Sequence, residues 1–340
     1  GDEMEPMMAC RVFEELAIQD GAVGWCAMIG AGNGYFGGLL PTAGAREVYA
    51  DRDVVLAGTF RPTGVAVAVD GGYRVEGRWP FASGIMHSSW LLAGCRILDG
   101  DSPRLTSSGA PVVKLMFLPR AEAKVIDTWH TGGLRGTGSH DFEVKDVFVP
   151  ANRSLWFTDP PVEGGPLYSF PALALFSPLI ASVSLGIARH ALEAFKELAG
   201  VKKPTLSQEL LRASPVAQSQ LGQAEGLLRA GRAFIYESLA DSWGVACRGD
   251  SLSWEQRSLL WLSATQAATQ ALQTVDIVYR AGGASSVYVS TQLERCLRDS
   301  RTASQHLQVM PTNYEVAGQF FLGADMSATT WGRDNRGDAA

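Results

Sequence analysis

The chain contains 340 residues, of which 46% are hydrophobic and 19% are charged, as is typical of folded globular proteins. Twenty-nine Lys and Arg residues stand against 35 Asp and Glu residues, which gives a formal net charge of −6 at pH 7. Because binding to a phosphate backbone needs concentrated positive charge, this balance argues against a general nucleic-acid-binding protein. The composition also argues against a disordered, collagen-like or coiled-coil chain.

Residues 1–56 have the pattern of a helical domain. Residues 8–19 place apolar side chains on one side, as an amphipathic helix does, and residues 21–32 are apolar all round, as in a buried helix. Residues 42–51 predict a short helix. A G-x-G-x-x-G match at 32–37 follows a helical segment and not a strand, so the pattern favours a flexible loop over a phosphate-binding turn.

Residues 57–150 change to the two-residue period of β-strands. Residues 73–79 alternate apolar and charged side chains, and residues 70–72, Asp-Gly-Gly, predict the turn of a hairpin. Further apolar stretches bounded by Gly, Pro and Asp predict strands within residues 88–98, 112–119, 124–129 and 141–150. Because no helical pattern separates these stretches, we expect a small antiparallel sheet or barrel.

Residues 151–340 return to a helical pattern. Residues 178–199, 215–247 and 254–281 predict long helices, and residues 286–307 predict a fourth. Four helices joined by short connections favour an up-down bundle.

One stretch of this helical region needs a membrane test. Residues 164–188 carry no charge, but three prolines interrupt them. A membrane-spanning helix needs about 20 mostly apolar residues in succession. We therefore expect a loop followed by the buried start of a core helix, and no membrane association.

The cysteines and histidines give no sign of a disulfide framework or of a metal site. The five cysteines are scattered, none belongs to a C-x-x-C pair, and the five histidines lack the spacing of metal ligands. We therefore expect free, mostly buried thiols, no metal and a cytoplasmic protein. The first residues are acidic and lack the plan of a signal peptide, and we expect part of the N-terminal helical domain to precede residue 1.

Residues 78–84, Arg-Trp-Pro-Phe-Ala-Ser-Gly, end a predicted strand with aromatic, small and hydroxyl-bearing side chains. A planar cofactor requires an aromatic wall, a close backbone approach and a hydrogen-bonding hydroxyl. A strand end packed beneath a turn would have the same composition, so the residues alone leave both interpretations open.

Four strings in a fixed order make the chain similar to the acyl-CoA dehydrogenase superfamily. They are GYRVEGRWPFASG, TGGLRGTGSHDFEVKDVFVP, YRAGGASSVY and LERCLRDSRTASQH, and the resemblance covers about residues 10–325. Within the superfamily, GRWPFASG, GLRGTGSHD and RTASQH resemble the branch of two-component flavin-dependent monooxygenases (group D). The resemblance implies an α+β fold with an N-terminal helical domain (1–56), a middle antiparallel β-domain (57–150) and a C-terminal four-helix bundle (151–340).

The resemblance also implies a flavin site. The family's Trp-x-Thr strand, whose Thr contacts flavin N5, aligns with GRWPFASG so that Phe81 takes the place of the Trp and Ser83 that of the Thr. The cofactor would be FAD or FMN, reduced by a separate flavin reductase and used with O2 on a small organic substrate. The residues that the resemblance assigns to the cofactor are Phe81, Ala82, Ser83, Gly84, Trp129, Gly282 and Gly283. Family members are usually tetramers, which implies a homotetramer here.

His306 distinguishes the enzymatic interpretations. Acyl-CoA dehydrogenases of the commonest type place a Glu shortly after the Arg-Asp motif, whereas this chain has His306 there and no acid. In the monooxygenase branch a His of this motif lies over the flavin and accepts a substrate proton, so the resemblance makes His306 a catalytic candidate together with Ser83.

Two alternatives remain open. One is an acyl-CoA dehydrogenase-like desaturation of a thioester bound to CoA or to a carrier protein, with Glu225 or Glu237 as the base. The other is a non-catalytic scaffold of the same fold. Aromatic hydroxylases of the branch often carry a second His after the Gly-Trp pair of the N-terminal zone. This chain has Asn33 and Tyr35 there and no His. Hydroxylation of a phenol therefore does not follow from the resemblance.

Overall fold

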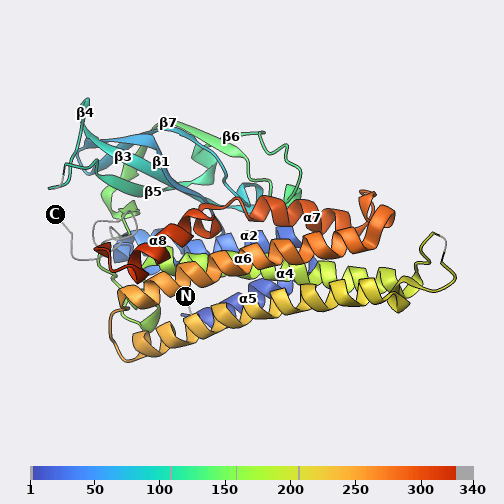
Figure 1. The fold of residues 1–340 in the computed structure, drawn as a ribbon. Coiled ribbons are helices and arrows are strands. Elements are labelled where there is room, and N and C mark those ends of the chain that lie inside the picture. The colour runs from blue at the N-terminus through green and yellow to red at the C-terminus, as the bar shows by residue number, and fades with distance from the viewer. Residues whose placement is uncertain (1–2, 108, 158, 206, 327–340) are drawn as a thin grey trace.

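A computed structural model describes residues 3–107, 109–157, 159–205 and 207–326. Helices and a sheet form two layers that pack against each other (Figure 1). The helices are α1 (Pro6–Gln19), α2 (Gly21–Gly34), α3 (Thr42–Val48), α4 (Ala172–Val201), α5 (Pro215–Cys247), α6 (Trp254–Gly282), α7 (Gln292–Ala303) and α8 (Thr312–Phe321). The strands are β1 (Leu56–Val69), β2 (Gly72–Trp79), β3 (Trp90–Asp99), β4 (Ser102–Pro103), β5 (Val113–Pro119), β6 (Lys124–Ile126), β7 (Asp141–Pro150) and β8 (Ser154–Leu155).

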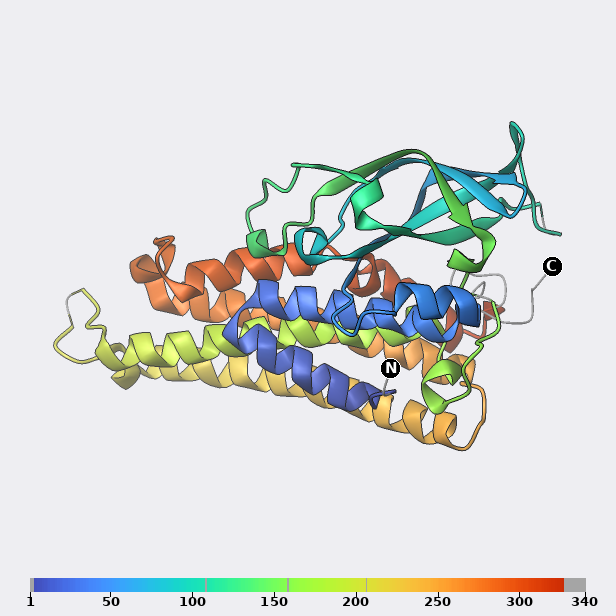
Figure 2. The same cartoon turned by 180° about the vertical axis from the view of Figure 1, so that it is seen from behind.

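The long helices α4, α5 and α6 lie along one another, and α1 and α2 pack on α4, with α1 crossing the long helices obliquely (Figure 2). The three long helices predicted from the sequence are confirmed, whereas the fourth begins at Gln292 and not at residue 286. Thr291 caps this helix, because its hydroxyl accepts the backbone N–H of Glu294.

Helix α4 is the one helix among the described residues that is long and apolar enough to cross a membrane. Its most apolar window is 89% buried inside the protein, against α1, α2 and α6. This burial is what a core helix requires, since an all-round apolar surface must be covered by other elements.

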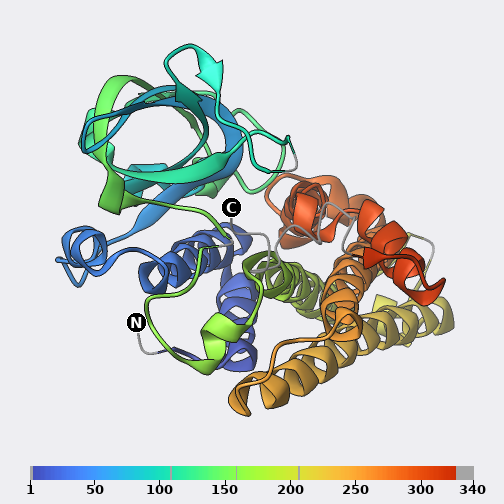
Figure 3. The same cartoon turned by 90° about the vertical axis from the view of Figure 1, so that its left-hand side faces the viewer.

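The sheet has the strand order β6-β7-β2-β1-β3-β5-β8, with β4 paired to β3, and it curls above the helices (Figure 3). The β1–β2 hairpin is confirmed, with Val69 opposite Gly72 and a two-residue turn between them. The expectation of a purely antiparallel sheet is wrong at one pair, because β1 and β3 are parallel. After β2 the chain crosses to the far side of β1 through residues 80–89, and β3 therefore runs in the same direction as β1.

The segment at residues 32–37 is not the flexible loop that its glycines predict. Helix α2 continues to Gly34, and a 3-10 turn follows at Tyr35–Gly38. Tyr35 and Phe36 are buried there, edge-on to the ring of Phe176. Burial of two aromatic rings offsets the cost of ordering the glycines.

Small residues let α1 and α4 approach closely. A Cβ atom on Gly186 would lie 2.3 Å from the Glu14 carbonyl oxygen and 2.6 Å from the Ala17 Cβ. Such distances lie well inside van der Waals contact, so the two helices require glycine at this position.

We predict that Gly186→Ala lowers the free energy of unfolding by about 1–3 kcal/mol, because the added methyl group overpacks a backbone contact. Gly200→Ala, near the end of the same helix, is the matched control, since a Cβ there meets nothing within 4 Å. The control is expected to gain about 0.5–1 kcal/mol from helix propensity. Urea unfolding followed by circular dichroism measures both, and equal stabilities would contradict the packing argument.

Candidate active site

The site begins where β2 ends. The backbone of Phe81 has a φ of 66° and that of Gly84 has a φ of 75°, so the chain turns sharply away from the sheet. The Ala82 N–H donates to the His140 carbonyl at 3.1 Å, and the Gly84 N–H donates to the Thr137 carbonyl at 2.8 Å. These bonds fix Ser83 against the loop that precedes β7.

Three buried hydroxyl groups lie in a row at this point. The Oγ atoms of Ser83 and Ser139 are 2.7 Å apart, and Ser139 Oγ is 2.6 Å from Thr137 Oγ1. Trp25 Nε1 of α2 donates to Ser83 Oγ at 3.0 Å. Cys26, the neighbour of Trp25, places its Sγ 3.9 Å from the Thr137 carbonyl oxygen, and burial raises its pKa to about 11. The row therefore links α2 to the β-layer.

His306 reaches the same place from the C-terminal helices. Its imidazole ring packs edge-on against the Trp25 indole, with ring centroids 5.6 Å apart and planes at 71°. Burial lowers the pKa of His306 to about 4, so the ring is neutral near pH 7. Its Nδ1 accepts the backbone N–H of Gln308 at 3.3 Å, which places the proton of the neutral ring on Nε2.

Buried polar contacts fix the turn that carries His306. The Gln308 side chain accepts the Ser177 hydroxyl of α4 at 2.5 Å. The Asn313 side chain donates to the Gln308 carbonyl at 2.9 Å and to Thr265 Oγ1 at 3.1 Å. The backbone that holds His306 is thus bound to α4, α6 and α8 together.

The loop before β7 is docked on α7 by three successive residues. The Arg298 guanidinium donates to the Gly132 carbonyl, and a Cβ on Gly133 would lie 2.1 Å from the Arg298 carbonyl oxygen. The Leu134 N–H donates to Asp299 Oδ1 at 2.6 Å, and Leu134 has a φ of 48°. These contacts hold the hydroxyl row against the helices that carry His306.

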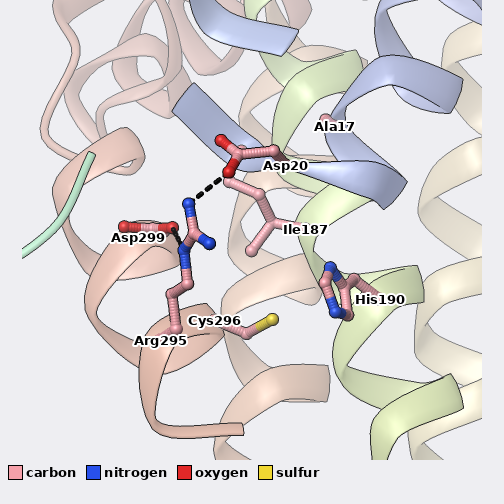
Figure 4. Close-up of a pocket in the computed structure, with 8 residues that line it drawn as sticks. Ala17, Asp20, Ile187, His190, Arg295, Cys296 and Asp299 are labelled. Carbon is pink, nitrogen blue, oxygen red and sulfur yellow. Dashed lines mark hydrogen bonds and ion pairs between the residues drawn. The ribbon is translucent and has the colours of Figure 1, made fainter. Parts of the chain in front are cut away.

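Arg295 connects these contacts between α7 and the loop before β7 to the start of α2. Figure 4 shows its guanidinium between the carboxylates of Asp20 and Asp299. Asp20 also caps α2 through two backbone N–H groups. The cavity beside them, next to His190 and Cys296, has a volume of about 10 Å³, room for roughly one water molecule and too little for a substrate. His190 is half-buried at this cavity.

The end of β2 fits a planar cofactor. Phe81 is 54% exposed and Met86 is 58% exposed, although both are large and apolar. Trp129 stands edge-on to Phe81, with ring centroids 6.2 Å apart. Ser83, 7% exposed, follows Phe81 two residues later in the sequence, and its hydroxyl group is bonded to Trp25 and Ser139. A flat ring with polar edges, such as an isoalloxazine, would cover the apolar side chains and meet the hydroxyl.

Most of the predicted site residues lie in one place in the structure. Phe81, Ala82, Ser83, Gly84 and Trp129 adjoin one another, and Trp25 links them to His306. Gly282 and Gly283 do not join them within the chain. They end α6, where Lys202 Nζ donates to the Gly282 carbonyl at 2.6 Å.

Sequence reasoning missed four residues of the site: Trp25, Thr137, Ser139 and Gln308. The Gly-Thr-Gly-Ser string at 136–139 carried the available signal for two of them, since its hydroxyl-bearing residues alternate with glycines. Nothing in the local pattern of Trp25 shows that it contacts a residue 58 positions away.

Comparison with known proteins agrees with this geometry. Residues 179–311 match the model of the acyl-CoA dehydrogenase C-terminal domain. Indole-3-acetate monooxygenase of Pseudomonas putida is 33% identical over 95% of this chain and 81% of its own length. The enzyme of the same name from Acinetobacter baumannii is 30% identical, over 95% of this chain and 82% of its own length.

Solved structures extend the likeness to the whole fold. 3-HSA hydroxylase from Rhodococcus sp. RHA1 superposes with a TM-score of 0.87 at 26% identity, covering 96% of this chain and 84% of its own. XiaF from Streptomyces sp., in complex with FADH2 and glycerol, gives a TM-score of 0.87 at 27% identity, covering 97% and 84%. The predicted α+β fold class is confirmed. This chain belongs to the acyl-CoA dehydrogenase superfamily, in its branch of flavin-dependent monooxygenase oxygenase components.

Proposed function

We propose that this flavin-dependent monooxygenase oxygenates a small, electron-rich aromatic compound of the indole type. The observation that carries the proposal is the arrangement of His306, Trp25 and Ser83, in which one indole ring contacts both a neutral imidazole and a buried hydroxyl. The two indole-3-acetate monooxygenases, at 33% and 30% identity, support the substrate class. When bound, a reduced flavin, FADH2 or reduced FMN, supplies the electrons and activates O2.

The strand end at 81–84 would hold the flavin. Phe81 and Trp129 would flank the ring system. The backbone of Ala82 and Gly84 is fixed by its hydrogen bonds to the loop that precedes β7. Ser83 would meet the flavin at N5, as its family position implies. The buried hydroxyl row beneath Ser83 keeps this contact in place and keeps water from it.

His306 would act on the substrate as a hydrogen-bond donor. Its Nδ1 lone pair is engaged by the Gln308 N–H, so Nε2 carries the proton. A neutral donor can hold an acceptor atom of the substrate while oxygen is transferred, and its hydrogen bond can stabilise a developing negative charge on that atom. The resemblance implies that His306 accepts a substrate proton, whereas its hydrogen bonding supports a role as a donor that polarises the substrate.

The acids proposed for thioester desaturation are placed elsewhere. Glu225 of α5 forms ion pairs with Arg189 and Arg229, each at 2.8 Å. Glu237 is exposed on the same helix. A carboxylate held by two guanidinium groups is a weak base, which favours the monooxygenase over the dehydrogenase.

We further propose a cytoplasmic homotetramer that receives its flavin from a separate reductase. All five cysteines are free, which suits a reducing compartment. Val287, Tyr288 and Val289 are exposed apolar residues beside the turn at 282–283. In the tetramer this turn would reach the flavin of a neighbouring subunit, which accounts for its distance from Ser83 within one chain.

A substrate panel tests the proposed function. Reduced flavin and 18O2 are supplied with indole, indole-3-acetate, phenol or an acyl thioester, and products are identified by mass spectrometry. We expect one labelled oxygen atom in the indole compounds. Oxygenation of phenol alone would overturn the substrate class, and desaturation of the thioester without labelled product would overturn the monooxygenase reaction.

We predict that His306→Ala lowers product formation by about 10²–10³-fold, the usual range for the loss of one hydrogen-bond donor to a developing charge. Reduced flavin should still be consumed, with hydrogen peroxide released in place of product. Chromatography and a peroxide assay measure the two fluxes. His190→Ala, at the small cavity, is the control and should keep its coupling. A fully coupled His306→Ala variant would show that His306 is only a packing residue.

The low pKa of His306 predicts a pH dependence of stability. Between about pH 4 and the ordinary imidazole pKa near 6.5, the unfolded chain binds a proton that the folded protein excludes. The contribution of His306 is therefore fully present above pH 6.5 and is lost as the pH falls toward 4. Urea unfolding at pH 7.0 and 4.5 should show a larger loss in the wild type than in His306→Gln. Equal losses would contradict the burial of this ring.

Light scattering is predicted to show a tetramer in solution. Val289→Glu should shift the protein toward smaller species and weaken flavin retention, because it puts a charge on the exposed apolar turn. A stable monomeric wild type that binds flavin tightly would rule out the proposed role of the turn.

A further inference from the structure

The hydrogen bonds of the hydroxyl row beneath Ser83 can be donated in only one direction along the row. Thr137 Oγ1 lies 2.8 Å from the Leu134 carbonyl oxygen. Two oxygen atoms this close repel each other unless a proton lies between them, and a carbonyl oxygen has none to give. The single hydroxyl proton of Thr137 is therefore committed to Leu134.

The remaining protons follow in order. The Thr137–Ser139 contact of 2.6 Å must use the proton of Ser139, because that of Thr137 is already committed. The Ser139–Ser83 contact of 2.7 Å must then use the proton of Ser83. At the far end, Trp25 Nε1 can only donate, and it donates to Ser83 Oγ. The four bonds form one chain from Trp25 to the Leu134 carbonyl.

This order of donors and acceptors decides how Ser83 can bond to another molecule. Its proton points to Ser139 and one lone pair accepts from Trp25, so a single lone pair remains. Toward any bound molecule, Ser83 can accept a hydrogen bond and cannot donate one.

We infer that Thr137 and Ser139 are positioning residues that make Ser83 a hydrogen-bond acceptor and thereby favour flavin in its reduced form. The inference rests on the proposed function, which places Ser83 at flavin N5. N5 bears a hydrogen atom in reduced flavin and a lone pair in oxidised flavin. A hydroxyl that can only accept forms a hydrogen bond with the N5 hydrogen of reduced flavin. Toward oxidised flavin it presents a lone pair to the N5 lone pair, which is unfavourable.

The Leu134 peptide group, which ends this chain of hydrogen bonds, is held in place by further contacts. The Leu134 carbonyl also accepts the indole N–H of Trp129 at 2.9 Å, and the Leu134 N–H is bound to Asp299. Ser83, Ser139 and Thr137 are all buried, which limits competition from water for their protons.

The test compares dissociation constants for reduced and oxidised flavin, measured anaerobically by fluorescence and dialysis. We expect the wild type to bind reduced flavin more tightly. Ser139→Ala frees the Ser83 proton, so oxidised flavin should bind about tenfold more tightly while reduced flavin binds as before. Thr137→Val frees the Ser139 proton to turn toward Ser83 and should act in the same direction. The midpoint potential of bound flavin should fall by about 30 mV, which corresponds to tenfold for two electrons.

Two further variants make the outcomes distinct. Thr131→Val is the control, because its hydroxyl bonds to the Gly133 carbonyl in the same loop but outside the chain; the affinity ratio should not change. Ser83→Ala should weaken the binding of reduced flavin, which loses its acceptor, and should not weaken the binding of oxidised flavin, which loses only an unfavourable contact. Unchanged ratios in Ser139→Ala and Thr137→Val, with reduced flavin weakened in Ser83→Ala, would overturn the directional chain alone. No effect in Ser83→Ala would overturn the placement of Ser83 at N5.

Discussion

The bond between the Leu134 N–H and the Asp299 carboxylate is the contact on which the site depends. It joins the loop before β7 to α7 at 2.6 Å, and Arg295 extends it to Asp20 at the start of α2. Together with the bond from Arg298 to the Gly132 carbonyl, it holds the hydroxyl row against the helical layer that carries the His306 turn. Burial raises the pKa of Asp299, which shows that the contact is made against a desolvation cost on the carboxylate. A carboxylate bound to a backbone N–H at a fixed distance gives the two layers one relative position.

Trp25 is the element common to both halves of the site. Its indole N–H is bound to Ser83, and its ring packs against the imidazole of His306. A single large, rigid side chain with one polar atom can set the separation of two reactive groups because it has only two side-chain torsions. The buried turn at Gln308 plays the matching part on the other side, since it fixes both the position of His306 and the nitrogen that carries its proton.

The sequence could predict much of the fold, because period and length are local properties. The alternation at 73–79 and the long apolar helices produced elements in their observed places. The parallel pairing of β1 and β3 could not be predicted in this way, since a two-residue period is the same in either direction. Ser83, Ser139 and His306 all lie in strings similar to the family's motifs, but those strings do not show that Ser139 bonds to Ser83, 56 residues away. Long-range hydrogen bonds leave no trace in local patterning.

The partial burial of Cys26 has a consequence for the durability of the protein. A site that activates O2 releases hydrogen peroxide whenever oxygen transfer fails, and the Cys26 sulfur lies beside the hydroxyl row. Peroxide attacks the thiolate and not the thiol. With a pKa of about 11, this cysteine is almost entirely protonated at neutral pH. The enzyme thus keeps an oxidisable atom next to its own oxidant in the one protonation state that resists attack.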